Sequence, residues 1–280
     1  MRLVFFGTPA ESVPALHALC DAGHDVAFVV TQPDRRRGRG GATLPSPVKA
    51  AAVELGIPVH TPARAREVVD AVAASGAELG VVVAFGQILP QALLDALPRG
   101  FVNVHFSLLP RWRGAAPVER TILAGDTETG VCIMQLEAGL DTGPVYVRAT
   151  TPIGPDDTAG DVMAALVAQG ADLLVRTLAE LPSLDPVAQE GEPTYAEKLT
   201  VEEFELRFDR PVDELVRIVR AGNPRPGAWS TVDGARVKVW RAENFDGTFR
   251  ALEVQPEGRA RMEADAWMRG LRELPPRWGS

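Results

Sequence analysis

The 280 residues are 46% hydrophobic and 24% charged, which is typical of a globular protein with a sizeable core, and the net charge of −8 argues against nonspecific coating of nucleic acid. The only two cysteines, Cys20 and Cys132, lack a Cys-x-x-Cys or histidine cluster, so we expect two buried, reduced thiols in a cytoplasmic protein and no metal site. Neither a signal peptide nor an apolar run approaching the roughly 18 residues that span a bilayer is found, so we expect no membrane contact.

Short apolar runs alternate with helical patterns through the first 105 residues. Runs of strand length lie at 3–6, 26–30, 57–59, 79–84 and 101–104. Helical patterns lie between them at 12–22, 47–55 and 64–74, and Ser46 is placed to cap the second of these helices. This alternation, with nearly continuous apolar strands, predicts an α/β fold with a doubly wound, mostly parallel sheet.

The pattern changes after residue 129. Strand patterns at 130–135 and 145–149 flank a glycine-framed loop, and a long amphipathic helix is expected at 161–181. Further on, a helix at 212–220 precedes two short strands at 228–232 and 236–240, joined by the hairpin signal Asp233-Gly234. We therefore expect an α/β domain at 1–190, a linker at 191–205 and a small β-rich C-terminal domain at 206–280.

Three segments follow predicted strands and should face one crevice, because an open parallel sheet binds ligands beyond the carboxyl ends of its strands. They are Gly7, Phe85-Gly86-Gln87 and Asn103-Val104-His105. Asn103 and His105 are two residues apart, so their side chains point the same way on an extended segment. Both can donate hydrogen bonds, which suits a carbonyl oxygen that becomes negative during nucleophilic attack, although a lone histidine at a strand end is more often structural.

Asp141 is the best carboxylate partner for this histidine. It lies between Gly139 and Gly143, which suits a tight loop close to a ligand, and an aspartate there would orient the imidazole and accept protons. The alternative is a turn aspartate that bonds its own backbone. A dinucleotide-binding dehydrogenase is disfavoured, because the cluster Gly38, Gly40 and Gly41 does not follow the first strand.

Two longer motifs resemble the signatures of the folate-dependent formyltransferases. The first runs from His105 to Pro117 as HFSLLPRWRGAAP, and the second is Gly139-Leu140-Asp141-Thr142-Gly143. Further segments resemble the methionyl-tRNA formyltransferase branch of this family, in the family's order along the chain. They are FGTP at 6–9, TQPD at 31–34, PSPVK at 45–49, PTYAEK at 193–198 and NPRPGAW at 223–229.

The resemblance implies that 10-formyltetrahydrofolate donates the formyl group and that the α-amine of methionyl-initiator tRNA accepts it. Asn103 and His105 would stabilise the oxyanion, and Asp141 would position His105 and help to move protons. The family's folate site would correspond to Phe85, Gln87, Ile88, Leu89, Ser107, Leu108, Leu109 and Pro110. For Leu89, Leu108 and Leu109 a plain core position is the alternative.

The basic segment after the second strand gains a role from the same resemblance. The family has a flexible loop here that inserts near the end of the tRNA acceptor stem, and guanidinium groups suit phosphate recognition. The corresponding tRNA-binding residues are Arg35, Arg36, Arg37, Arg39 and Lys49. We expect a monomer that binds tRNA and folate.

The C-terminal sequence departs from the family's pattern. The family's C-terminal domain resembles an oligonucleotide-binding β-barrel, and about two strands' worth of sequence is missing after Phe245. Arg225 also stands where an aromatic residue is usual. Two alternatives therefore stay open: a formyltransferase acting on a small amine such as an amino sugar nucleotide, and a non-catalytic protein that binds tRNA or folate.

Overall fold

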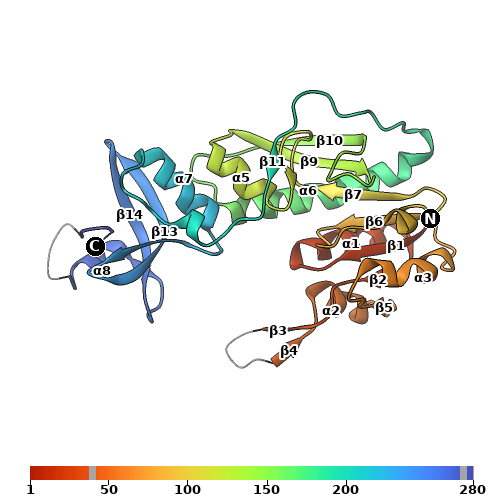
Figure 1. Ribbon diagram of the computed structural model, residues 1–280, viewed down its shortest axis with the longest axis horizontal. Helices are drawn as coiled ribbons and strands as arrows, with labels where there is room; N and C mark the ends of the chain where they lie inside the picture. Colours follow the sequence, from red (N-terminus) through yellow and green to blue (C-terminus); the bar gives the residue numbers. More distant parts are fainter. Residues whose placement is uncertain (38–41, 272–275, 280) are drawn as a thin grey trace. The chain divides into compact units, whose positions relative to one another are not determined.

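A computed structural model describes residues 1–37, 42–271 and 276–279 (Figure 1). The chain forms two compact units, each assembled from separate stretches of sequence. The first comprises Met1–Ala115, Thr129–Thr151 and Ala164–Tyr195, and the second Ala116–Glu128, Pro152–Met163 and Ala196–Ser280. The domain boundaries expected from the sequence, at 190 and 206, stay a prediction.

The first unit is built around a seven-stranded sheet with the order β10-β9-β7-β6-β1-β2-β5. Its strands are β1 (Arg2–Gly7), β2 (Asp25–Val30), β5 (Val59–His60), β6 (Leu79–Val83), β7 (Phe101–His105), β9 (Glu128–Gln135) and β10 (Val145–Pro152). Strands β7, β6, β1, β2 and β5 pair in parallel, whereas β9 runs antiparallel to β7. The strand order reverses between β1 and β6, so the carboxyl ends of β1, β6 and β7 lie at a switch point. The mostly parallel sheet is confirmed.

Helices fill the connections between these strands. They are α1 (Val13–Asp21), α2 (Pro47–Glu54), η2 (Ala65–Val68), α3 (Val69–Ala73) and α4 (Gln91–Leu94), with the short turn η1 (Ala10–Ser12). Helix α6 (Ala159–Glu180) and the short turn η3 (Leu181–Ser183) follow β10, and the start of α6 belongs to the second unit. The predicted cap of α2 is confirmed, because the Ser46 hydroxyl accepts from the Lys49 amide. The single helix expected at 64–74 is instead two pieces, because Val68 leaves helical geometry at φ −108° and ψ 7°.

The core of the first unit is made by the sheet's apolar side chains. Phe6 packs edge to face against Phe85 and Phe101, which joins the ends of three neighbouring strands. A smaller buried cluster of Leu109, Cys132, Met134 and Val145 lies on β9 and beside it. Cys132 is buried as expected, whereas Cys20 is partly exposed because it lies at the edge of the α1 face that buries Leu16 and Leu19.

Helix α6 contradicts the expectation that no apolar run is long enough to span a membrane. The stretch Ala159–Ser183 has that length and apolarity, and no other helix in the described part of the chain does. Half of its most apolar 18-residue window is buried, and Gly170 lies so close to the sheet that an added Cβ would meet Val104 at 3.0 Å and Val131 at 3.3 Å. The apolar face of α6 therefore packs on a sheet, which is also how the core helix of a globular protein behaves.

The second unit contains a four-stranded antiparallel sheet with the order β12-β13-β14-β15. Its elements are α5 (Pro117–Ala124), η4 (Glu202–Phe204), α7 (Val212–Gly222), β12 (Ala228–Val232), β13 (Ala235–Phe245), β14 (Thr248–Pro256), β15 (Met262–Glu263) and α8 (Ala264–Met268). The predicted turn at Asp233-Gly234 is confirmed, with φ of +51° and +73°. A second turn at Asp246-Gly247 pairs β13 with β14, so the C-terminal sequence forms a small β-rich unit.

Two further strand pairs are short. Strands β3 (Arg35–Arg37) and β4 (Ala42–Leu44) form an antiparallel hairpin stem within the basic segment, where the resemblance implied a flexible loop. Strands β8 (Arg113–Gly114) and β11 (Tyr195–Ala196) pair the end of the first signature motif with the segment that follows α6. Residues expected to belong to a linker thus take part in regular structure.

Candidate active site

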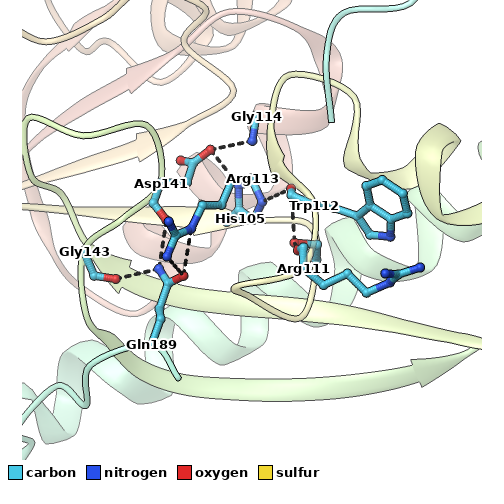
Figure 2. Close-up of polar contacts among 9 residues, drawn as sticks. His105, Arg111, Trp112, Arg113, Gly114, Asp141, Gly143 and Gln189 are labelled. Atoms are coloured by element: carbon cyan, nitrogen blue, oxygen red, sulfur yellow. Dashed lines mark hydrogen bonds and ion pairs between the residues drawn. The ribbon is translucent and has the colours of Figure 1, made fainter. Parts of the chain in front are cut away.

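His105 ends β7 and lies between two oxygen acceptors (Figure 2). Its Nε2 lies 2.9 Å from the Trp112 carbonyl oxygen, and its Nδ1 lies 3.7 Å from Oδ2 of Asp141. A carbonyl only accepts, so Nε2 carries a hydrogen and Nδ1 is the nitrogen that faces the carboxylate. The side chains of His105 and Asp141 are only 6% and 12% exposed, so water screens their interaction weakly. Asp141 is therefore placed to orient the imidazole and to stabilise a proton gained at Nδ1.

The loop between β9 and β10 holds Asp141 in a left-handed conformation, with φ of +49°. Oδ2 of Asp141 accepts a hydrogen bond of 2.9 Å from the Gly114 amide, which comes from the first signature motif. Gly143 follows the turn where the backbone passes closest to β9: an added Cβ would lie 2.0 Å from the Gln135 carbonyl oxygen. Only glycine fits there, which explains the second glycine of the motif.

Asn103 shares the face of β7 with His105, as their spacing predicted. The two residues lie opposite Met134 and Cys132 of β9, and Asn103 remains half-buried while His105 is buried. Burial raises the pKa of the Cys132 thiol, so this cross-strand neighbour of His105 stays protonated and is a poor nucleophile. Asn103, His105 and Asp141 thus bring an amide, an imidazole and a carboxylate to this strand end.

Gln189 and Arg113 also belong to the site, although sequence reasoning gave neither residue a role. Gln189 Nε2 donates 2.8 Å hydrogen bonds to the carbonyl oxygens of Asp141 and Gly143. Its Oε1 accepts from Nε and Nη2 of Arg113 at 3.1 and 2.7 Å. Figure 2 shows these contacts converging on the Asp141 turn. Gln189 follows α6 at a separation of 48 residues from Asp141, so no local pattern signals it.

Polar contacts join the segments that follow β1, β2 and β6. The Thr8 hydroxyl and the Gln32 amide both donate to the Phe85 carbonyl oxygen at 2.9 Å. Gln87 Oε1 accepts from the Ala65 amide at 2.7 Å. The turn after β6 is thereby held on both sides. Thr8 and Gln32 belong to segments that carried the family resemblance, but sequence reasoning gave neither side chain a role.

The residues expected to line a folate site differ in exposure. Ile88 is 84% exposed, and Gln87, Leu108 and Pro110 are partly exposed. Phe85, Leu89, Ser107 and Leu109 are buried. The buried Ser107 hydroxyl donates to the Arg111 carbonyl oxygen at 2.6 Å and so shapes the first signature motif from within. Leu89 and Leu109 occupy core positions, so any contact with a ligand falls mainly to the exposed members.

Comparison with known proteins identifies the family. Residues 1–178 match the formyl transferase family, and residues 198–251 match the formyl transferase C-terminal domain. The chain belongs to the formyl transferase family.

Relatives of this formyltransferase are similar over most of their length. The methionyl-tRNA formyltransferase of Roseobacter denitrificans is 52% identical, covering 89% of this chain and 85% of the relative. Among solved structures, a methionyl-tRNA formyltransferase from Clostridium thermocellum aligns with a TM-score of 0.62 at 16% identity, over 91% of this chain and 98% of the other. The sugar 3N-formyltransferase WlaRD, solved in the presence of dTDP and 5-N-formyl-THF, has a TM-score of 0.66 at 16% identity, over 93% and 99%. At such identities the two structures show a common fold.

The structure describes four of the five basic residues that the resemblance assigned to tRNA binding. Arg35, Arg36 and Arg37 form β3, and Arg39 lies outside the described residues. Lys49, on α2, makes a 2.6 Å ion pair with Asp34, the residue that precedes β3. The Thr31 and Ser46 hydroxyls also bond each other at 2.8 Å, so polar contacts join the two ends of the segment that carries the hairpin. Within the described residues, no group of three or more His, Cys, Asp or Glu side chains could hold a metal ion.

Proposed function

We propose that this formyltransferase transfers the formyl group of 10-formyltetrahydrofolate to the α-amine of methionyl-initiator tRNA during translation initiation. The pairing of His105 with Asp141 at 3.7 Å, next to Asn103 on the same strand face, is the observation that carries the chemistry. The 52% identity to a methionyl-tRNA formyltransferase over most of both chains supports the choice of acceptor.

The reaction requires stabilisation of a developing negative charge. The acceptor amine attacks the formyl carbon, and the formyl oxygen gains the electron pair of the carbonyl π bond. Asn103 Nδ2 and the His105 imidazole donate hydrogen bonds to that oxygen, which is stabilising because the donors are fixed by β7 before the reaction begins. In the free protein His105 Nε2 donates to the Trp112 carbonyl oxygen, so this N–H turns from that oxygen to the formyl oxygen when the formyl donor is bound.

Proton transfer is the second requirement. The attacking nitrogen must lose a proton, and the folate nitrogen that leaves the formyl carbon must gain one. His105 and Asp141 together provide this transfer: the imidazole takes up the amine proton at Nδ1, and the neighbouring carboxylate stabilises the resulting cation. The imidazolium then gives a proton to the folate nitrogen as the oxyanion re-forms the carbonyl and the bond between the formyl carbon and that nitrogen breaks. The formyl carbon ends on the amine, and tetrahydrofolate leaves with its nitrogen protonated.

The donor site lies at the carboxyl ends of β6 and β7. We assign its lining to the exposed or partly exposed members of the expected set, Gln87, Ile88, Leu108 and Pro110, with Ile88 and Leu108 offering apolar surface and the backbone after β6 offering hydrogen bonds. The buried members Phe85, Leu89, Ser107 and Leu109 support this lining from behind. The contacts of Thr8 and Gln32 with Phe85 support a preformed wall for a flat ring system.

The acceptor tRNA is bound by the basic hairpin and by the C-terminal domain, 206–280. Arg35, Arg36, Arg37, Arg39 and Lys49 contact phosphates near the end of the acceptor stem. In this proposal the protein acts in the cytoplasm as a monomer. Residues 1–190 form the catalytic domain, residues 191–205 the linker, and residues 206–280 the tRNA-binding domain.

A formylation assay tests this proposal. Purified protein is incubated with 10-formyltetrahydrofolate and either charged initiator tRNA, charged elongator methionine tRNA or an amino sugar nucleotide. Formyl-methionine on the initiator tRNA, with at least about tenfold slower formylation of the other two, supports the proposal. Preferential formylation of the amino sugar nucleotide would reassign the enzyme to a small-amine acceptor.

A further inference from the structure

Gln189 uses the full hydrogen-bonding capacity of its side-chain amide within the site. The two N–H groups of Nε2 are directed to two carbonyl oxygens, and Oε1 accepts from two nitrogens of one guanidinium. An amide offers two donors and two acceptor positions, so no capacity is left over. Rotating the amide by 180° would place donors against the Arg113 guanidinium and an acceptor against carbonyls. The orientation of the side chain is therefore fixed by chemistry.

These contacts close a ring of interactions around Asp141. Arg113 and Gly114 are adjacent in the chain: Arg113 holds Gln189, while the Gly114 amide holds the Asp141 carboxylate at 2.9 Å. Gln189 in turn holds the Asp141 main chain at 2.8 Å. Asp141 is thus fixed at two points, its carboxylate from one direction and its backbone from the other.

The backbone conformation of Asp141 makes its contact with Gln189 necessary. A non-glycine residue at φ of +49° occupies a sparsely populated region and persists only when its surroundings enforce it. Without Gln189, the Asp141 and Gly143 carbonyl oxygens would lose the hydrogen bonds that its Nε2 donates. The turn would then be held less firmly, although it must keep the Asp141 carboxylate 3.7 Å from His105. Displacement of catalytic groups by about 1 Å is enough to reduce rates about a hundredfold.

The segment that carries Gln189 is itself anchored on the first unit. Val187 pairs with Val145 of β10 through reciprocal backbone hydrogen bonds of 2.8 and 2.9 Å. Thr194 accepts from the Trp112 amide through its hydroxyl and from the Arg113 amide through its carbonyl, both at 2.9 Å. Gln189 lies between these two anchors, so its backbone is placed independently of the contacts it makes with the Asp141 turn.

We infer that Gln189 is a positioning residue for formyl transfer: it holds the Asp141 turn in its catalytic conformation, with Arg113 fixing the orientation of the Gln189 amide. The inference assigns part of the active site to the segment after α6. It rests on the proposed function for its kinetic readout, whereas its structural readout is independent of the acceptor.

Three variants and one control test the inference in the full-length protein. Gln189→Leu removes all four hydrogen bonds, and Gln189→Glu keeps an oxygen for Arg113 but removes the donors to the turn. Arg113→Met removes only the hydrogen bonds between the Arg113 guanidinium and Oε1 of Gln189. Glu190→Gln, at an exposed neighbouring position, is the control. Formylation of charged initiator tRNA gives kcat and both KM values, and hydrogen exchange reports on the amides of residues 137–143.

We expect Gln189→Leu and Gln189→Glu to lower kcat about 10- to 100-fold with both KM values within about twofold, and to speed exchange across 137–143. Arg113→Met should lower kcat less, and Glu190→Gln should match the wild type. In an Asp141→Asn background, Gln189→Leu should cost less than about threefold, because the two residues act as one unit. If Gln189→Leu does not fold, Gln189→Glu carries the test.

Unchanged kcat and unchanged exchange in the Gln189 variants would overturn the inference, as would an undiminished loss in the Asp141→Asn background. If the wild-type protein fails to formylate initiator tRNA, the proposed acceptor is wrong, and the exchange measurement still decides whether Gln189 holds the turn.

Discussion

Replacing Asp141 with asparagine removes the charge that faces His105 and leaves the shape of the side chain nearly unchanged. The carboxylate lies 3.7 Å from Nδ1, and both side chains are almost fully buried. Two unit charges about 4 Å apart interact by about 4 kcal/mol at an effective dielectric constant of about 20. Because about 1.4 kcal/mol corresponds to a tenfold change in rate, loss of this interaction in the transition state corresponds to about 10³-fold.

The expected loss in kcat is therefore between about 10² and 10³, since the asparagine oxygen can still accept from the Gly114 amide and retain part of the geometry. Both KM values should change by less than about threefold, because the interaction develops only when the imidazole is charged. Single-turnover formylation with saturating donor and charged initiator tRNA isolates the chemical step.

Asp70→Asn is a matched control, because Asp70 is an exposed aspartate in the first turn of α3 and the substitution changes the net charge equally. It should leave kcat within about twofold of the wild type. A loss of less than about threefold for Asp141→Asn, or a loss confined to KM, would refute the assignment of Asp141 to proton transfer.

Three further predictions have defined outcomes. Asn103→Ala should lower kcat about 10²-fold with little change in melting temperature, because it removes one oxyanion donor from a half-buried position; formylation and thermal unfolding measure both. Gly143→Ala should lower kcat at least tenfold, since its Cβ would lie 2.0 Å from a carbonyl oxygen, whereas Gly270→Ala, with its nearest neighbour at 3.4 Å, should be neutral. Lys49→Met should weaken tRNA binding and reduce the slope of the logarithm of the binding constant against the logarithm of the salt concentration by roughly 0.8. Asp34→Asn should strengthen tRNA binding, because it frees the Lys49 ammonium from its ion pair. If both variants weaken binding equally, Lys49 makes no direct phosphate contact.

Local patterns predicted the framework of the first unit well. The apolar strands of β1, β2, β6 and β7 are buried throughout or nearly so, and such runs are typical of parallel strands covered on both sides. Ser46 was predictable as a cap because its hydroxyl needs only a neighbouring amide three residues away. The strand separation of Asn103 and His105 likewise follows from period-two alternation alone.

Helix ends and apolar length were predicted less well. Helix α6 begins at Ala159, before the expected 161, because Thr158 and Asp161 cap it reciprocally: each backbone amide donates to the other side chain. The Thr158 hydroxyl and the Thr158 amide both donate to Oδ2 of Asp161, and these two bonds lower the pKa of the Asp161 carboxyl. Gln169, Gly170 and Asp172 interrupt the apolar run in the sequence of α6, so the run was judged too short to span a bilayer. The mean hydropathy over the most apolar part of Ala159–Ser183 is nevertheless 1.5.

The site could be predicted only where its residues share a motif. Asp141 was a candidate because two glycines frame it, and the structure places it beside His105. Gln189 carries no comparable signal: its hydrogen-bond partners are 46, 48 and 76 residues away, and its own segment is rich in turn-forming residues. Contacts at such separations are set by the packing of β10 and the segment after α6, which local sequence does not encode.

The choice of acceptor is the central claim, and direct competition between acceptors tests it best. Wild-type protein, limiting 10-formyltetrahydrofolate, and equal concentrations of charged initiator tRNA and an amino sugar nucleotide are mixed, and both formylated products are quantified. We predict that formyl-methionyl-tRNA accounts for at least about nine-tenths of the product, since discrimination worth about 1.4 kcal/mol is sufficient for that ratio. Formylated sugar as the main product would contradict the account.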